Sequence, residues 1–149
     1  VRHADLKGYS FSRDDVDARS LANQYAQMLG QIFTHEMKPM EVEILVAEVD
    51  YEGDSQKNQM FHILYDGTVK DEASFAVLGG ESEIILERFE SLYKANMTLP
   101  KSLSACITAL SGEGRKIDPG DLEVAELSIA NGRRAFRRIT GTELEDLVI

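Results

Sequence analysis

The chain has 149 residues, of which 43% are hydrophobic and 28% are charged. These values are typical of one globular domain and exclude an intrinsically disordered chain. The formal net charge is −10, and an acidic surface repels phosphate backbones, so we expect no nucleic-acid partner. No apolar run approaches the roughly 18 residues of a membrane span, so we expect no membrane partner.

The first clear pattern is a helical period over residues 14–37, which predicts an amphipathic helix. Ser12 and Asp15 are spaced as a start signal, and Pro39 ends the helix. The predicted apolar face consists of Leu21, Tyr25, Met28, Leu29, Ile32 and Phe33.

Three strands are predicted after this helix. Residues 41–50 are apolar on both faces, which indicates a strand covered on both sides. Residues 60–65 and about 74–78 have the composition of two further strands. Between them, Asp66 and Gly67 predict a two-residue hairpin turn with a positive φ at both positions.

The second half of the chain alternates two helices, two strands and a short helix. Helical periods occupy residues 81–96 and 100–110, and strands are predicted over 122–129 and 134–140, before a final helix at 144–148. The predicted apolar faces of the first two helices are Ile85, Phe89, Leu92 and Tyr93, and Leu103, Cys106, Ile107 and Leu110.

This element order predicts an α+β fold with a largely antiparallel sheet, because strands joined by hairpins are separated from the helices. Helices on both sides of the strands suggest layers of helix, sheet, sheet and helix. Five strands are too few for two complete sheets. Since the chain also begins with Val1, we expect it to be part of something longer.

Neither the histidines nor the cysteine form a recognisable catalytic or metal-binding pattern. His3, His35 and His62 lie far apart and have no metal-ligand spacing. Cys106 lies on an apolar helix face, where burial raises a thiol pKa, so we expect an unreactive thiol. We therefore assign no catalytic, cofactor-binding or metal-binding residue, and no cofactor.

A dense arginine cluster follows a second predicted hairpin turn, Asn131-Gly132. Its members are Arg133, Arg134, Arg137 and Arg138. One interpretation is that these side chains pair with the carboxylates of a partner. The other is that they protect an exposed edge strand from aggregation. The sequence leaves both open.

Several segments, in this order, resemble the α-type subunit of the bacterial (actinobacterial) 20S proteasome. They are SLANQYAQMLGQIFT (20–34), KPMEVEILVAEVD (38–50), ILYDGTVKDE (63–72), FAVLGG (75–80) and DLEVAELSIANGRRAFRRITGTELEDL (121–147). The resemblance implies an N-terminal-nucleophile hydrolase-like four-layer αββα sandwich. It also implies that residues 1–149 form a single proteasome-subunit domain that is incomplete at its N-terminus.

The resemblance further implies a non-catalytic subunit of the outer α ring. Its partners would be other α subunits in a seven-membered ring, β subunits, a regulatory ATPase ring and passing protein substrates, in the cytoplasm. The arginine cluster would then be a possible partner contact. Two alternatives remain: a catalytic β-type subunit with an N-terminal threonine nucleophile, and an unrelated acidic α+β binding module.

Overall fold

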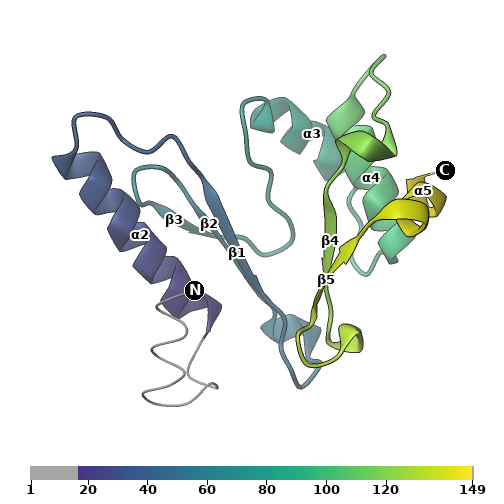
Figure 1. Ribbon diagram of the computed structural model, residues 1–149, viewed down its shortest axis with the longest axis horizontal. Helices are drawn as coiled ribbons and strands as arrows, with labels where there is room; N and C mark the ends of the chain where they lie inside the picture. Colours follow the sequence, from purple (N-terminus) through teal and green to yellow (C-terminus); the bar gives the residue numbers. More distant parts are fainter. Residues whose placement is uncertain (1–16, 149) are drawn as a thin grey trace. The chain divides into compact units, whose positions relative to one another are not determined.

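The computed structural model describes residues 17–148 of the chain. The chain divides into two compact units, of which the first ends at Phe75 and the second begins at Ala76. Each unit is described by itself (Figure 1).

The predicted first helix is present as α2, Ala18–His35. Asp17 caps it, because its carboxylate accepts a hydrogen bond from the Ser20 N–H at 2.6 Å. A second carboxylate, Glu48, accepts from the Ala18 N–H at 2.9 Å. The predicted start signal at Ser12 and Asp15 lies outside the described residues.

The buried face of α2 is rotated from the predicted one. Leu29 is fully buried as expected, but the other two buried residues are Ala18 and Ala22. Met28 and Phe33, assigned to the apolar face, are 41% and 44% exposed. Alanine lets the helix backbone approach the sheet closely, so the contact line follows small side chains rather than large ones.

The first unit contains a three-stranded antiparallel sheet in the order β1-β2-β3. Its strands are β1 (Ile44–Glu48), β2 (Gln59–Ile63) and β3 (Val69–Asp71). The helix α2 packs on one face of this sheet, where Phe61 and Ile63 form a core with Leu29 (Figure 1).

The third strand differs from the predicted one, as does the turn before it. Leu64 N–H bonds to the Thr68 carbonyl at 2.9 Å, which leaves a three-residue loop instead of two. Of the two predicted turn residues, Gly67 has a positive φ, +87°, and Asp66 does not. The short loop pairs Val69 with Ile63 at once, so β3 begins there, whereas residues 74–78 are not a strand.

The expectation that β1 is covered on both faces is also wrong for the described residues. Ile44 and Val46 pack against the core of the first unit. On the opposite face Leu45 remains 43% exposed. Apolar residues on a strand face show that this face is suitable for burial. They do not show that another element packs against it.

The second unit contains three helices and a two-stranded antiparallel sheet. They are α3 (Ser82–Leu92), α4 (Leu99–Ser111), β4 (Val124–Leu127), β5 (Phe136–Ile139) and α5 (Gly141–Val148). Leu103, Ile139 and Leu144 form the core that joins α4, β5 and α5.

Both helical faces of this unit were largely predicted, with one correction. Phe89 of α3 is buried and Leu103 of α4 is buried, as expected. Cys106 and Leu110 are exposed instead, and Ala105 and Ala109 are buried in their place. These small residues allow α3 and α4 to pack closely.

Helices with antiparallel sheets in both units confirm the predicted α+β class. The single-domain assignment for residues 1–149 stays a prediction.

Candidate interaction surface on the final hairpin

The hairpin β4–β5 carries the arginine cluster, and its turn is longer than predicted. The Ser128 N–H bonds to the Ala135 carbonyl at 2.8 Å, so residues 129–134 form a six-residue loop rather than a two-residue turn at Asn131-Gly132. The Asn131 side chain donates to the Ala135 carbonyl at 3.0 Å and thereby closes the loop. A side chain that bonds its own loop stabilises a longer connection.

The two faces of this hairpin have different environments. Val124 and Ile139 face each other across the strands and belong to the core of the second unit. Ala125 and Arg138 form the next pair and, by the alternation of a strand, lie on the other face. Phe136 lies on that face too and is 54% exposed.

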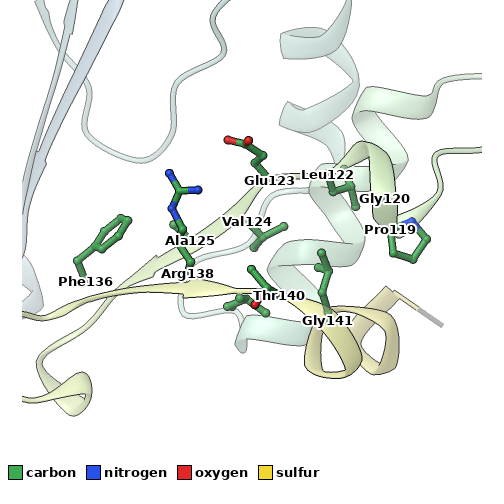
Figure 2. A pocket seen from close by; sticks show the side chains of 12 residues that line it. Pro119, Gly120, Leu122, Glu123, Val124, Ala125, Phe136, Arg138, Thr140 and Gly141 are labelled. Atoms are coloured by element: carbon green, nitrogen blue, oxygen red, sulfur yellow. The ribbon is translucent and has the colours of Figure 1, made fainter.

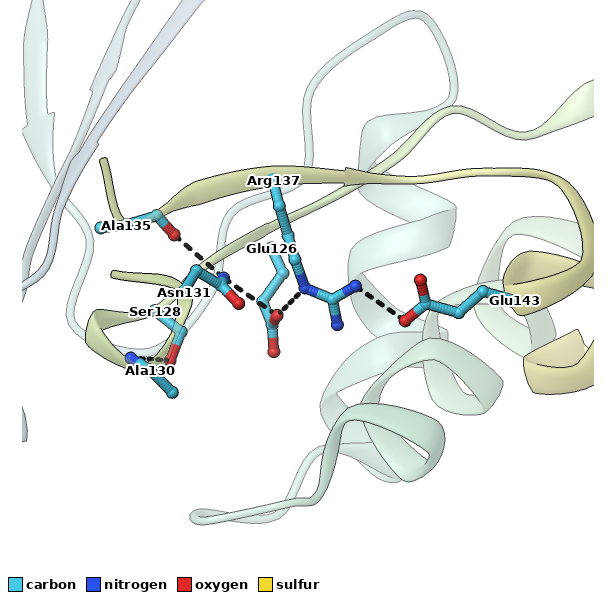
Figure 3. Close-up of polar contacts among 7 residues, drawn as sticks. All are labelled: Glu126, Ser128, Ala130, Asn131, Ala135, Arg137 and Glu143. Carbon is cyan, nitrogen blue, oxygen red and sulfur yellow. Dashed lines mark hydrogen bonds and ion pairs between the residues drawn. The ribbon is translucent and has the colours of Figure 1, made fainter. Parts of the chain in front are cut away.

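Arg137 is occupied within the chain and is not a free partner contact. Its Nε bonds to Glu126 Oε2 and its Nη1 to Glu143 Oε1, both at 2.7 Å (Figure 3). The Asn131 amide donates to the same Glu126 oxygen at 3.1 Å. The network joins β4, β5, the hairpin loop and α5.

The network shifts the acid–base equilibria of its charged members. The hydrogen bond from Asn131, followed by that from Arg137, lowers the pKa of Glu126. The hydrogen bonds to Glu143 and then to Glu126 raise the pKa of Arg137. Both shifts stabilise the ion pair in the folded protein.

The three remaining arginines are exposed and separate from this network. Arg138 lies on the open face of the hairpin together with Phe136. Arg133 and Arg134 lie in the turn before β5, so the predicted strand over 134–140 is wrong at its start, because β5 begins at Phe136. Within residues 17–148 none of the three forms an ion pair.

A pocket of about 380 Å³ includes part of this open face. Figure 2 shows the side chains of Glu123, Phe136 and Arg138 on the same side of the hairpin. An aromatic ring beside an unpaired guanidinium is the composition of a protein contact, because aromatic residues and arginine are enriched at interfaces. We call the side formed by Glu123, Ala125, Phe136 and Arg138 the open hairpin face.

Cys106 is not a candidate nucleophile. The residue is exposed, yet partial desolvation raises the pKa of its thiol. A raised pKa disfavours the reactive thiolate at neutral pH.

His62 is a buried polar residue of β2. It is 6% exposed, its Nε2 lies 2.7 Å from Glu43 Oε2, and its Nδ1 lies 3.7 Å from Glu72 Oε1. No local sequence pattern indicates this cluster, because its members are brought together only by the pairing of the three strands. Among the described residues no group of three or more His, Cys, Asp or Glu is suited to hold a metal ion.

None of the helices between residues 17 and 148 is long and apolar enough to cross a membrane.

Comparison with known proteins identifies the class of this chain. Residues 3–128 match the model of the proteasome subunit family. The chain therefore belongs to the proteasome subunit family, and this membership confirms the N-terminal-nucleophile hydrolase-like fold class.

The curated relatives narrow the relationship to one type of subunit. The chain is 54% identical, over 98% of its length, to proteasome subunit alpha of Acidimicrobium ferrooxidans. It is 48% identical to proteasome subunit alpha 1 of Rhodococcus erythropolis and 46% identical to proteasome subunit alpha of Mycolicibacterium vanbaalenii, in both cases over 99% of the chain. The match covers 62%, 60% and 60% of these relatives, respectively.

Proposed function

We propose that this chain acts as a non-catalytic subunit of the α ring of the 20S proteasome. The observation that carries the proposal is the 54% identity to a protein named proteasome subunit alpha, over 98% of the chain. The exposed arginines of the final hairpin, which form no ion pair within residues 17–148, are free to contact other subunits of the ring.

In this role the chain forms a seven-membered outer ring with other α subunits and stacks on a ring of β subunits. The ring controls the entry of protein substrates and receives a regulatory ATPase ring, and the complex works in the cytoplasm. Peptide bonds are cut by the β subunits. The chain contributes one proteasome-subunit domain to this particle and supplies no nucleophile.

Co-expression with an actinobacterial proteasome β subunit tests the assembly. We expect native mass spectrometry to show particles that contain this chain in multiples of seven together with β subunits. A chain that stays monomeric beside intact β rings would contradict the proposed assembly.

A peptidase assay of the chain without the β subunit tests the non-catalytic role. We expect no cleavage of fluorogenic peptides, and cleavage only in the co-expressed particle. Turnover by the chain alone that a threonine-directed inhibitor blocks would assign it to the catalytic β type.

A further inference from the structure

The second unit carries two surface stripes of opposite charge that lack ion pairs. One consists of Arg133, Arg134 and Arg138 on the final hairpin. The other consists of Glu83, Glu87 and Glu90 on the exposed side of α3. No ion pair within residues 17–148 involves a member of either stripe. Arg137 of β5, which does form ion pairs, is not a member of the arginine stripe.

Both stripes are short. Glu83 and Glu90 are seven residues apart on a helix, which corresponds to about 10 Å at 1.5 Å per residue. Arg134 and Arg138 are four residues apart, and the chain between them turns at Ala135, which has a φ of +56°. Their separation is therefore less than the roughly 13 Å of an extended chain. Two long arginine side chains can reach two carboxylates of the helix within one contact.

Exposed apolar side chains accompany both stripes. Phe136 is 54% exposed beside Arg138 on the open hairpin face. On α3, Ile84 is 52% exposed and Leu86 is 37% exposed, next to the glutamates. Ile84 and Leu86 flank the glutamates on either side, so both surfaces combine charges with exposed apolar side chains, as protein interfaces do.

We propose that the open hairpin face of one copy, with Arg134 at its turn, binds the glutamate stripe of α3 on a second copy. The inference rests on the proposed ring assembly and identifies one of its contacts. The two surfaces are different, so the contact is head-to-tail, the arrangement that generates closed rings. Arginine suits this role because its planar fork bonds carboxylates in pairs.

Charge exchange tests the contact. The first variant combines Arg134→Glu with Arg138→Glu, the second combines Glu83→Arg with Glu87→Arg, and a third carries all four changes. Each of the first two places like charges opposite each other and should raise the dissociation constant of the ring contact at least about tenfold. The third restores opposite charges between the four changed positions and should recover assembly.

Native mass spectrometry of each variant, co-expressed with the β subunit, measures the assembled fraction. Lys101→Glu combined with Arg115→Glu is the matched control, because it makes the same charge change in the same unit, outside both stripes. Circular dichroism verifies that every variant is folded. We expect the control to assemble like the wild type.

Two results would overturn the inference while leaving the proposed function intact. The arginine variant could assemble as the wild type does, which would remove the hairpin from the contact. Both charge-reversed variants could fail without rescue in the third, which would mean that the two stripes do not meet. Failure of the wild type itself to assemble with the β subunit would instead contradict the proposed function.

Discussion

The two sheets of this protein differ in the polar contacts on the face that lies opposite their packed side. In the first sheet, His62 lies opposite the helix-covered side and is paired with Glu43 and Glu72. In the second sheet, Arg138 occupies the corresponding uncovered face and has no ion pair among residues 17–148. A side chain that is hydrogen-bonded within its own sheet stabilises the fold, whereas an unpaired one is free for the partner contact that we propose. The difference therefore distinguishes a sheet whose second face is bonded internally from one whose second face we propose as a contact surface.

The strongest way to break the first sheet is to hollow its core. Leu29→Ala should lower the free energy of unfolding by about 2–5 kcal/mol, because Leu29 is fully buried between α2 and the sheet. Urea denaturation followed by circular dichroism measures the loss. Met28→Ala, at a position that is 41% exposed, should cost less than about 1 kcal/mol. Equal losses in the two variants would contradict the rotated helix face.

The hairpin loop of the first sheet offers a second test. Gly67 has a φ of +87°, and an added Cβ would lie 2.5 Å from the Ala26 carbonyl oxygen. Gly67→Ala should therefore cost about 1–2 kcal/mol for the left-handed backbone and a further ~1–3 kcal/mol for the overlap. Gly114→Ala is the control, since its φ of +85° is similar but nothing lies within 4 Å. Thermal unfolding should show the larger loss for Gly67→Ala, and a reversed order would contradict close packing of the loop on α2.

The internal pairing of the first sheet is tested at His62. His62→Ala should cost about 1–3 kcal/mol, because the partly buried Glu43 loses its hydrogen bond. Lys70→Ala changes the exposed residue that faces His62 across β2 and β3, and it should change stability by less than about 0.5 kcal/mol. Chemical denaturation at neutral pH compares the two. An unchanged free energy of unfolding in His62→Ala would mean that the stability of this sheet does not depend on the contact between His62 and Glu43.

The smallest expected effect sharpens the picture of the second sheet. Because the pKa of Glu126 is lowered in the folded state, its carboxylate stabilises the fold above its ordinary pKa. This contribution is lost as the pH falls below about 4.3 toward the folded-state pKa. The stability advantage of the wild type over Glu126→Gln should therefore shrink in acid.

Acid titration of the unfolding midpoint measures this effect. Glu123→Gln is the matched control, because Glu123 lies on the open hairpin face and makes no ion pair with Arg137. Parallel acid profiles for Glu126→Gln and the wild type would show that the Arg137 network has no stabilising role.

Periodicity predicted the helices well because their apolar residues recur on one side over several turns. It placed the faces less well. On α2 the contact follows Ala18 and Ala22, whose small side chains carry little hydrophobic signal but allow close approach. The same replacement occurs on α4, where Ala105 and Ala109 are buried instead of Cys106 and Leu110. The close approach of the helices to their neighbours, and not hydrophobicity alone, therefore determines which residues of these helices are buried.

The hairpins show why strand boundaries and site geometry were harder to predict. Both turn sequences do form turns, but each loop is longer than two residues. In the first loop, other loop residues precede Gly67, and in the second, the Asn131 side chain bonds to its own loop. The longer second loop removed Arg134 from the strand, and the network around Arg137 depends on that loop and on α5. Such contacts are set by tertiary structure and leave no local pattern in the sequence.

The hydrogen bond from the Ala18 N–H to Glu48 has a consequence for strand alignment. Glu48 comes 30 residues later in the chain and lies on the same face of β1 as Ile44 and Val46. A slip of β1 by one residue would turn this carboxylate to the opposite face and leave the first turn of α2 without its second acceptor. This single polar contact therefore disfavours the misaligned sheet. The N–H groups in the first turn of a helix have no acceptor within the helix, so the helix cannot replace the lost bond.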